Sequence, residues 1–423
     1  MQDKNKITRI SYIIEAGFEY FISLFVTGTM LGYLLDSLGF SDALQGIIST
    51  VATFTCGAQL FAIVLKGRKK KRIVTLLHSI NQLAFVLIYF LPIFNFSSNV
   101  KTLLLMLFLF AGHILNNAVS PAKITWLMSS VAYESRGKFT ATKEMISLAG
   151  GIMVSLLFGR IADVYRDIDG MPTRPYYVIC AIALFVMMLI HTASLLISEE
   201  KPVDEKRTEI RKTIGSLVKN RDLLKIIGVG IIWNIASAFS VSFLASYLRE
   251  ELAFSFTVIA VMSTLGSIVR IVASPFFGRF ADKYSFANSM TLAFASVAVA
   301  FLGIVFTAPG TRWIYLVYVC IHAFAMAGIN SGVINLIYDY VAPSDRAVAM
   351  GVKNALGGII AFLVALVAGF ILSAIQEADG IVILGIRLYA QQFLAFISFA
   401  ITLLLIVYMR LVISPLKKIK STQ

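Results

Sequence analysis

Long apolar segments alternate along the chain with short polar ones, and most apolar segments have the length of a membrane-spanning helix. Residues 73–94 and 391–409 show this most clearly. A helix needs about 20 apolar residues to cross a hydrocarbon core of ~30 Å. These runs are continuous, and backbone amides cannot stay unpaired in lipid, so the pattern predicts helices and not a barrel. The predicted fold class is therefore all-α, a polytopic membrane protein.

Glycine, proline and charge clusters divide this pattern into twelve predicted transmembrane helices. They cover residues 10–35, 43–65, 73–94, 101–125, 140–163, 175–198, 224–248, 254–277, 286–308, 312–338, 348–374 and 388–412. The first segment is too long for a signal-peptide core and lacks a small-residue cleavage pattern, so we expect it to remain as the first span.

Composition agrees with the pattern. Of 423 residues, 58% are apolar and only 14% are charged, which leaves too little polar surface to cover soluble cores. The three cysteines, Cys56, Cys180 and Cys320, lie in separate apolar stretches, so we expect packing residues and not a disulfide or metal site. No cofactor is expected; the predicted energy source is a transmembrane ion gradient.

The net charge of +14 is concentrated at the N-terminus, in the loops after even-numbered spans and in the C-terminal tail. The segment 66–72 alone holds six lysines and arginines. By the positive-inside rule this places both termini in the cytoplasm and the protein in the cytoplasmic membrane. No soluble basic domain exists to bind nucleic acid, so the basic excess is expected to contact membrane lipid.

An internal repeat divides the chain. Arg136, Lys143 and the Asp169-Gly170 pair recur 210 positions later as Arg346, Lys353 and Asp379-Gly380. The basic segment 199–223 lies between the two copies. The repeat predicts an N-terminal six-helix bundle over 1–198, a cytoplasmic linker over 199–223 and a C-terminal six-helix bundle over 224–423.

The motif Gly278-Arg279-Phe280-Ala281-Asp282-Lys283 follows the eighth predicted span, and arginine-bearing loops precede the fifth and eleventh. These features resemble the major facilitator superfamily (MFS) of secondary transporters, and the resemblance covers the whole chain. It implies two pseudo-symmetric six-helix bundles around a solute site. One departure is that the first-half copy, Gly67 to Lys71, has lysine where the family usually has aspartate.

The resemblance also suggests gating residues. Gly278 is expected to permit a sharp exit from the eighth helix, and Asp282 to meet a basic group or a helix N-terminus. An inter-half pair of Glu144 with Arg270 is expected as a gate. The loop arginines complete this set: Arg136 and Arg346. A similar motif, Gly159 to Asp163, is interpreted as a helix end.

One face of the first span carries Tyr12, Glu15, Glu19, Ser23 and Thr27, at spacings of three and four residues. Two carboxylates one turn apart repel when both are ionised, and burial favours the neutral form. Glu15 and Glu19 are therefore the predicted proton-coupling pair. The alternatives are a solvated Glu15 with Glu19 in a structural ion pair, or sodium at the same carboxylates.

In the family, the first, fourth, seventh and tenth helices line the central cavity, and each carries polar side chains here. Such groups recognise solutes, but they also serve as ordinary interhelical hydrogen bonds. The predicted cavity residues are Tyr12, His113, Asn116, Asn117, Trp233, Asn234, His322 and Asn330.

The sequence therefore predicts a monomeric secondary transporter for a small solute, working by alternating access and coupled to protons. Acids in the cavity favour neutral or cationic solutes, and import and export both remain open. The alternatives are an efflux antiporter for multiple drugs or amphipathic compounds, and a sensor with a transporter fold. No zinc-protease helix, nucleophile elbow or phosphate-binding loop is present, which argues against an enzyme.

Overall fold

The structure is a computed structural model, and it describes residues 2–63, 70–131, 136–166, 172–200, 220–340, 346–383 and 386–416. Among these residues, ten helices are long and apolar enough to cross a membrane. Two helices bent by 41°, Asn5–Phe25 and Gly28–Ser37, pass the same test when taken together, and Ile314–Asn330 is a shorter apolar helix. These segments follow the twelve predicted spans in order, so the all-α polytopic fold is confirmed.

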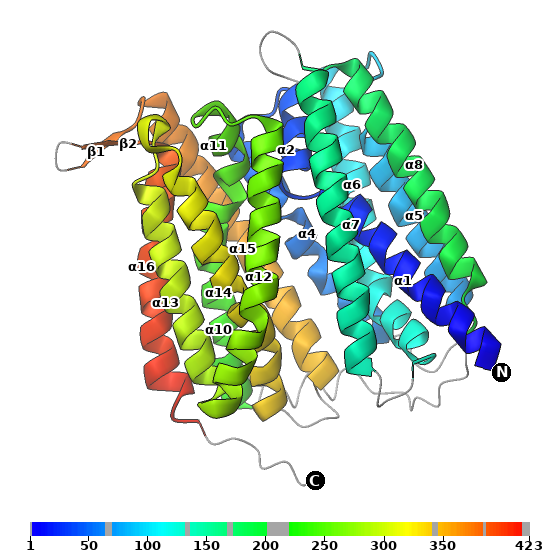
Figure 1. The fold of residues 1–423 in the computed structure, drawn as a ribbon. Helices are drawn as coiled ribbons and strands as arrows, with labels where there is room; N and C mark the ends of the chain where they lie inside the picture. The colour runs from blue at the N-terminus through cyan, green and yellow to red at the C-terminus, as the bar shows by residue number, and fades with distance from the viewer. Residues whose placement is uncertain are drawn as a thin grey trace. The chain divides into compact units, whose positions relative to one another are not determined.

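Figure 1 labels most of the helices and both strands. The first-half helices are α1 (Gln2–Phe25), α2 (Gly28–Ser37), α3 (Asp42–Ser49), α4 (Val51–Phe54), the 3₁₀ helix η1 (Thr55–Ile63), α5 (Lys71–Ile88), α6 (Ser98–Met128), α7 (Arg136–Val164) and α8 (Arg174–Ile197). The second half contains α10 (Arg221–Ser240), η3 (Val241–Phe243), α11 (Leu244–Glu250), α12 (Phe256–Lys283), α13 (Phe286–Val305), η4 (Pro309–Thr311), α14 (Ile314–Tyr340), α15 (Arg346–Glu377), α16 (Ala390–Tyr408) and the π-helical η5 (Met409–Ile413).

One small β-hairpin was not predicted. Strands β1 (Ile381–Ile383) and β2 (Ile386–Leu388) pair antiparallel after α15, with Val382 opposite Arg387. Two strands of three residues do not change the all-α class. Glycine at 380 has a φ of +103°, which suits the turn out of α15 because glycine has no Cβ.

The contacts divide the chain into two compact units. Unit 1 comprises Met1–Phe40, Ala58–Thr208 and Ser255–Ala260. In it, α1 packs against α7 and α8, and α5 packs against α6 and α8 (Figure 1). A buried cluster around Trp126 joins these helices, and the Trp126 indole donates a hydrogen bond to the carbonyl of Glu199. Burial of the large apolar and aromatic side chains positions the polar groups described below.

The first span is broken between α1 and α2, where the two helix axes differ by 41°. Gly28 has a φ of +59° at the break, a left-handed conformation that costs other residues roughly 1–2 kcal/mol. The hydroxyl of Tyr89 donates to the carbonyl of Phe25 at 2.7 Å, so a carbonyl freed by the break is satisfied inside the bundle. The break is thus a defined part of the fold.

Unit 2 comprises Ser41–Gly57, Glu209–Phe254 and Val261–Gln423. Here α13 packs against α14 and α16, and α10 packs against α15 and α16. Helices α3 and α4 pack on α15, because a glycine allows the backbones to approach closely: a Cβ added at Gly358 would lie 2.0 Å from the Thr53 carbonyl oxygen. In this division, 41–57 is grouped with unit 2 and 255–260 with unit 1, and the predicted bundles over 1–198 and 224–423 with their linker stay a prediction.

The expected helix exit at Gly278 is wrong. Helix α12 continues past this residue to Lys283, and nothing lies within 4 Å of a Cβ built on it. A single glycine lowers helix propensity by about 1 kcal/mol, which the rest of a 28-residue helix outweighs.

Candidate functional site

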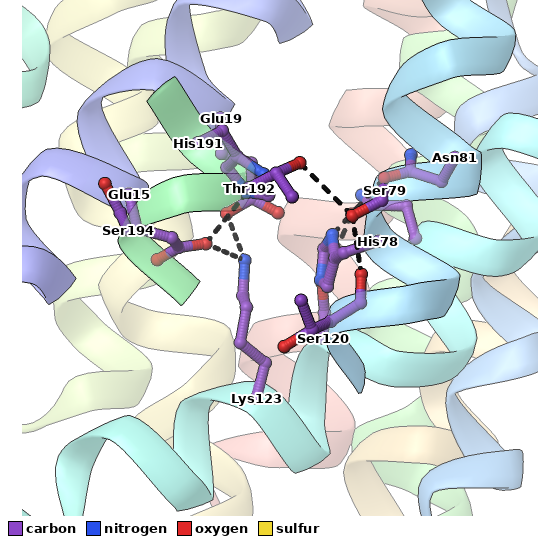
Figure 2. A network of polar contacts seen from close by, with 12 residues as sticks. Glu15, Glu19, His78, Ser79, Asn81, Ser120, Lys123, His191, Thr192 and Ser194 are labelled. Atoms are coloured by element: carbon purple, nitrogen blue, oxygen red, sulfur yellow. Dashed lines mark hydrogen bonds and ion pairs between the residues drawn. The ribbon is translucent and has the colours of Figure 1, made fainter. Parts of the chain in front are cut away.

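A buried charge cluster lies in unit 1 where α1, α6 and α8 meet. The ammonium of Lys123, on α6, lies 2.5 Å from Glu15 Oε1 and 2.5 Å from Glu19 Oε2 (Figure 2). The Lys123 side chain is 2% exposed and that of Glu15 is 1% exposed, whereas Glu19 is 25% exposed. The two acids predicted from the stripe on the first span therefore share one lysine.

Lys123 reaches this position because of its register on α6. It lies one helical turn after Ser120, on a helix whose buried face includes Val119, Ala122 and Trp126. Buried apolar neighbours give the ammonium a low-dielectric surrounding, where a charge is tolerated only with opposite charges and hydrogen bonds. Two carboxylates supply both.

Two histidines extend the cluster behind Glu15. His191 Nε2, on α8, lies 3.2 Å from Glu15 Oε1, and the rings of His191 and His78 are 5.5 Å apart between centroids. His78, on α5, contacts Asn81 at 3.3 Å, and the Asn81 amide donates to the carbonyl of Gly112. Figure 2 shows the same network with Ser79 and Thr192 bridging α5 and α8.

The charges in this cluster do not cancel. Two carboxylates and one ammonium leave a net charge of −1 when both histidines are neutral. An uncompensated charge inside a protein is costly, and the group normally neutralises instead. The arrangement can therefore take up one proton or another small cation. Among the residues that the structure describes, no group of three or more His, Cys, Asp and Glu side chains has the arrangement of a metal site.

Other predicted residues of the first half lie around this cluster. Tyr12 is buried in the core of unit 1, and the Lys143 ammonium lies 4.9 Å from the centre of its ring. His113 packs against Phe85 and interacts with the backbone of Val26 at the break in the first span. Here His113 supports the broken helix directly.

The two asparagines predicted for the cavity on α6 make side-chain hydrogen bonds. Asn117 accepts one from Gln59 at 3.3 Å, and Asn116 accepts one from Ser120 at 3.4 Å. Both asparagines are half-buried. These contacts agree with ordinary interhelical bonding, and a part in solute binding stays a prediction.

The predicted cavity residues of the second half lie in unit 2. Trp233 is buried against Phe294, with ring centroids 5.8 Å apart. Asn234 packs over Gly357, His322 lies beside Tyr318, and Asn330 is exposed. Contacts of these residues with a solute stay predictions.

The predicted gating residues are only partly described. The side chains of Arg136, Asp282 and Arg346 lie outside the described residues. Glu144 is exposed on unit 1 and Arg270 is half-buried on unit 2, and their pairing stays a prediction.

The motif from Gly159 to Asp163 does more than end a helix. The Asp163 carboxylate accepts hydrogen bonds from the backbone N–H groups of Phe256 and Thr257 at 3.0 and 2.9 Å, and from the Thr257 hydroxyl. These N–H groups belong to the first turn of α12, where backbone N–H groups have no hydrogen-bond partners inside their own helix. A Cβ at Gly159 would lie 3.2 Å from the Phe256 carbonyl oxygen, so the missing side chain permits this close contact. Asp163 therefore caps a helix from the other half of the sequence.

The sequence reasoning missed Lys123, His78 and His191 as members of the cluster. Lys123 could have been found, because an ionisable residue inside a predicted span is a functional candidate by default. The histidines gave a weaker signal, because each stands alone in an apolar helix and only the packing of α5 and α8 brings them together.

Comparisons with known proteins agree with this architecture. The family model described as Major Facilitator Superfamily matches residues 16–321 and 227–423. None of the curated proteins compared with the chain matches it.

Several solved structures share the fold. A variant of the nucleoside transporter NupG is 14% identical with a TM-score of 0.72, and the match covers 95% of this chain and 99% of that one. An auto-inhibited POT family peptide transporter is 12% identical with a TM-score of 0.73, covering 100% and 98%. A bacterial homologue of the human lysosomal transporter Spinster is 13% identical with a TM-score of 0.69, covering 97% and 96%. Because the family model matches most of its length, the chain belongs to the Major Facilitator Superfamily and is a secondary transporter, not an enzyme.

Proposed function

We propose that the protein couples movement of a small solute to protons, and that the cluster of Glu15, Glu19 and Lys123 is the coupling site. The observation that carries this proposal is that two carboxylates, the buried one of Glu15 and the partly exposed one of Glu19, share one buried ammonium. One proton removes the excess negative charge. The site then changes between a neutral and a charged state, which a transporter needs to link protonation to conformation.

The exposures of the two acids suggest their roles. Glu19 is the more exposed, so we assign to it the exchange of the proton with the solute pathway. Protonation of Glu19 leaves Lys123 paired with Glu15 alone, a neutral pair. Loss of that proton restores a second negative charge beside Lys123, which favours hydration of the site.

This charge balance also supports a solute class. A cationic group on the solute relieves the same negative charge, and a neutral solute adds none, whereas a polyanion is repelled. We therefore propose neutral or cationic solutes. We further propose both termini in the cytoplasm and a plasma-membrane location, on the strength of the lysines and arginines in the even-numbered loops.

The test starts with a thermal-shift screen of the purified protein against classes of small solutes, including nucleosides and peptides, the substrates named for two proteins of the same fold. A confirmed solute is then followed in proteoliposomes with an imposed pH gradient, with a sodium gradient as a separate arm. The variant Glu19→Gln should abolish stimulation by the pH gradient. Its matched control, Glu377→Gln, changes an exposed acid at the end of α15 and should retain it.

Equal flux with and without the pH gradient, together with an unchanged Glu19→Gln variant, would refute proton coupling. Stimulation by sodium alone would assign the same carboxylates to sodium. The direction of the stimulated flux relative to the gradient distinguishes a symporter from an efflux antiporter.

A further inference from the structure

Helices α5 and α8 meet behind Glu15 along a seam marked by the His78–His191 ring pair and the Ser79–Thr192 contact. On these helices and on Glu15, several buried polar atoms have no partner among the described residues. They are Glu15 Oε2, His191 Nδ1, His78 Nε2, Thr75 Oγ1 and Gln82 Oε1. Each of these residues is less than a tenth exposed. Buried polar atoms in proteins are nearly always hydrogen-bonded, either to protein groups or to ordered water.

Hydrogen bonding sets which of these atoms can accept. The Asn81 amide nitrogen donates to the Gly112 carbonyl, so the Asn81 oxygen faces His78 and receives the proton on His78 Nδ1. In neutral His78 the free Nε2 is then an acceptor. Likewise His191 Nε2 donates to the Glu15 carboxylate, which leaves His191 Nδ1 as an acceptor.

The unpartnered atoms are therefore almost all acceptors: two imidazole nitrogens, a carboxylate oxygen and an amide oxygen, with one hydroxyl that can donate or accept. Acceptors cannot satisfy one another. They need a donor from outside the chain, and water or a hydrated proton is the smallest species that offers several.

These groups also form a column along the seam. Thr75, His78 and Gln82 are spaced by three and four residues and share one face of α5. Ser79 contacts Thr192 on α8 at 3.2 Å, which closes the seam beside them. Thr75 lies one turn from Lys71, a half-buried residue at the start of α5 whose ammonium donates to the Leu196 carbonyl on α8 at 2.8 Å. The path from His78 to that end is about 10 Å along the helix.

The charged and titratable groups around Glu15 come from every helix packed on it. They are Glu19 and Tyr12 on α1, Lys123 on α6, His191 on α8, with His78 on α5 behind it, and Lys143 and Glu144 on α7 near Tyr12. Among the described residues of this group, the unpartnered acceptors are Glu15 Oε2, His191 Nδ1 and His78 Nε2. The other oxygen of Glu15 is already held by Lys123 and His191.

We propose that this seam binds a short chain of water molecules and conducts protons between Glu15 and the Lys71 end of α5, by a route separate from the solute pathway. This inference rests on the proposed coupling site and adds a second access to it. Glu19 exchanges its proton on the partly exposed side, and Glu15 exchanges through His191, His78 and Thr75. A carboxylate pair with two separate accesses can load a proton on one side and release it on the other.

The test follows protonation of Glu15 without a transported solute. Proteoliposomes containing the full chain are subjected to a pH jump, and time-resolved infrared spectroscopy records the carboxylic acid band that Glu15→Gln removes. Thr75→Val, which keeps the shape of the side chain, should slow the rise of this band about ten-fold, equivalent to about 1.4 kcal/mol in the barrier. Thr75→Ser should restore the rate, and His78→Phe should slow it at least as much.

The matched control is Thr291→Val, a buried threonine on α13 whose hydroxyl is bonded within its own helix. It should leave the Glu15 rate unchanged. An unaltered rate in both Thr75→Val and His78→Phe would overturn the seam route, and so would the absence of any Glu15 band at all pH values. The two proposals can fail separately. If the pH gradient drives solute flux but Thr75→Val leaves the rate of the Glu15 band unchanged, the seam route is refuted and proton coupling stands. If Thr75→Val slows the Glu15 band but the pH gradient drives no solute flux, proton coupling is refuted and the seam route stands.

Discussion

Replacing Lys123 by methionine should destabilise the protein in a way that depends strongly on pH. Methionine matches lysine in length and helix propensity, so α6 itself is little affected. What changes is the charge: Glu15, 1% exposed, loses its cation and must either stay ionised in the interior or bind a proton. Binding a proton is the less costly response.

The magnitude follows from the ordinary acidity of glutamate. A glutamate with a pKa of about 4.3 costs about 3.7 kcal/mol to protonate at pH 7, and about 1 kcal/mol at pH 5. The first value agrees with the roughly 3–5 kcal/mol lost when one partner of a buried ion pair is removed. The folded variant binds one proton more than its unfolded chain, so its stability falls as pH rises, by about 1.4 kcal/mol per unit above the ordinary value.

Thermal unfolding of the purified protein at pH 5, 6 and 7 measures this effect. The difference between the original protein and Lys123→Met should widen steadily from pH 5 to pH 7, and Glu15→Gln added to Lys123→Met should remove most of the pH dependence. The control is Lys225→Met, which breaks an exposed pair with Asp222 that is worth less than about 1 kcal/mol. A Lys123→Met loss that does not vary with pH, or that Lys225→Met reproduces, would refute the buried charge cluster.

Three further variants test other contacts by the same unfolding assay. Gly358→Ala places a Cβ 2.0 Å from the Thr53 carbonyl oxygen and should lower the free energy of unfolding by about 1–3 kcal/mol. The control, Gly303→Ala, has nothing within 4 Å of the added Cβ and should be neutral or stabilising. Equal effects of the two variants would contradict the close contact of α3 and α4 with α15. Asp163→Ala removes the cap of α12 and should lower the free energy of unfolding by about 0.5–2 kcal/mol. Asp163→Asn should lie between the original protein and Asp163→Ala. No loss of stability in either variant would argue against the cap. Burial and two neighbouring carboxylates raise the pKa of Glu251, so the folded state loses stability as pH rises through that pKa. The variant Glu251→Gln should therefore stabilise the protein at pH 7 but not below about pH 4. A stabilisation that persists at low pH would contradict this cause.

The coupling acids illustrate how far pattern reasoning reaches. Glu15 and Glu19 were predicted because their spacing places them on one face of a helix, and that face cannot point at lipid. The alternative, a structural pair of Glu19 with a cation, was also left open, and the structure supplies such a cation in Lys123. Which residue that would be did not follow from periodicity, because 104 positions separate the two.

Asp163 gives the opposite case. Its motif was interpreted as a helix end, which is correct for α7, since that helix stops at Val164. The contact that matters lies 93 positions away, at the start of α12. Nothing local in either segment signals it, since any helix start offers free N–H groups.

The sequence by itself determined the all-α class, the series of membrane-spanning helices and the acidic face of the first helix. These features follow from local constraints: lipid requires continuous apolar helices with paired amides, and helical geometry places residues three and four apart on one face. Only the tertiary structure decided that Glu15 and Glu19 share Lys123, that His191 and His78 lie behind them, and that Asp163 caps α12. Such partners are chosen by packing between distant helices, where burial makes an unpaired charge or acceptor too costly to leave alone.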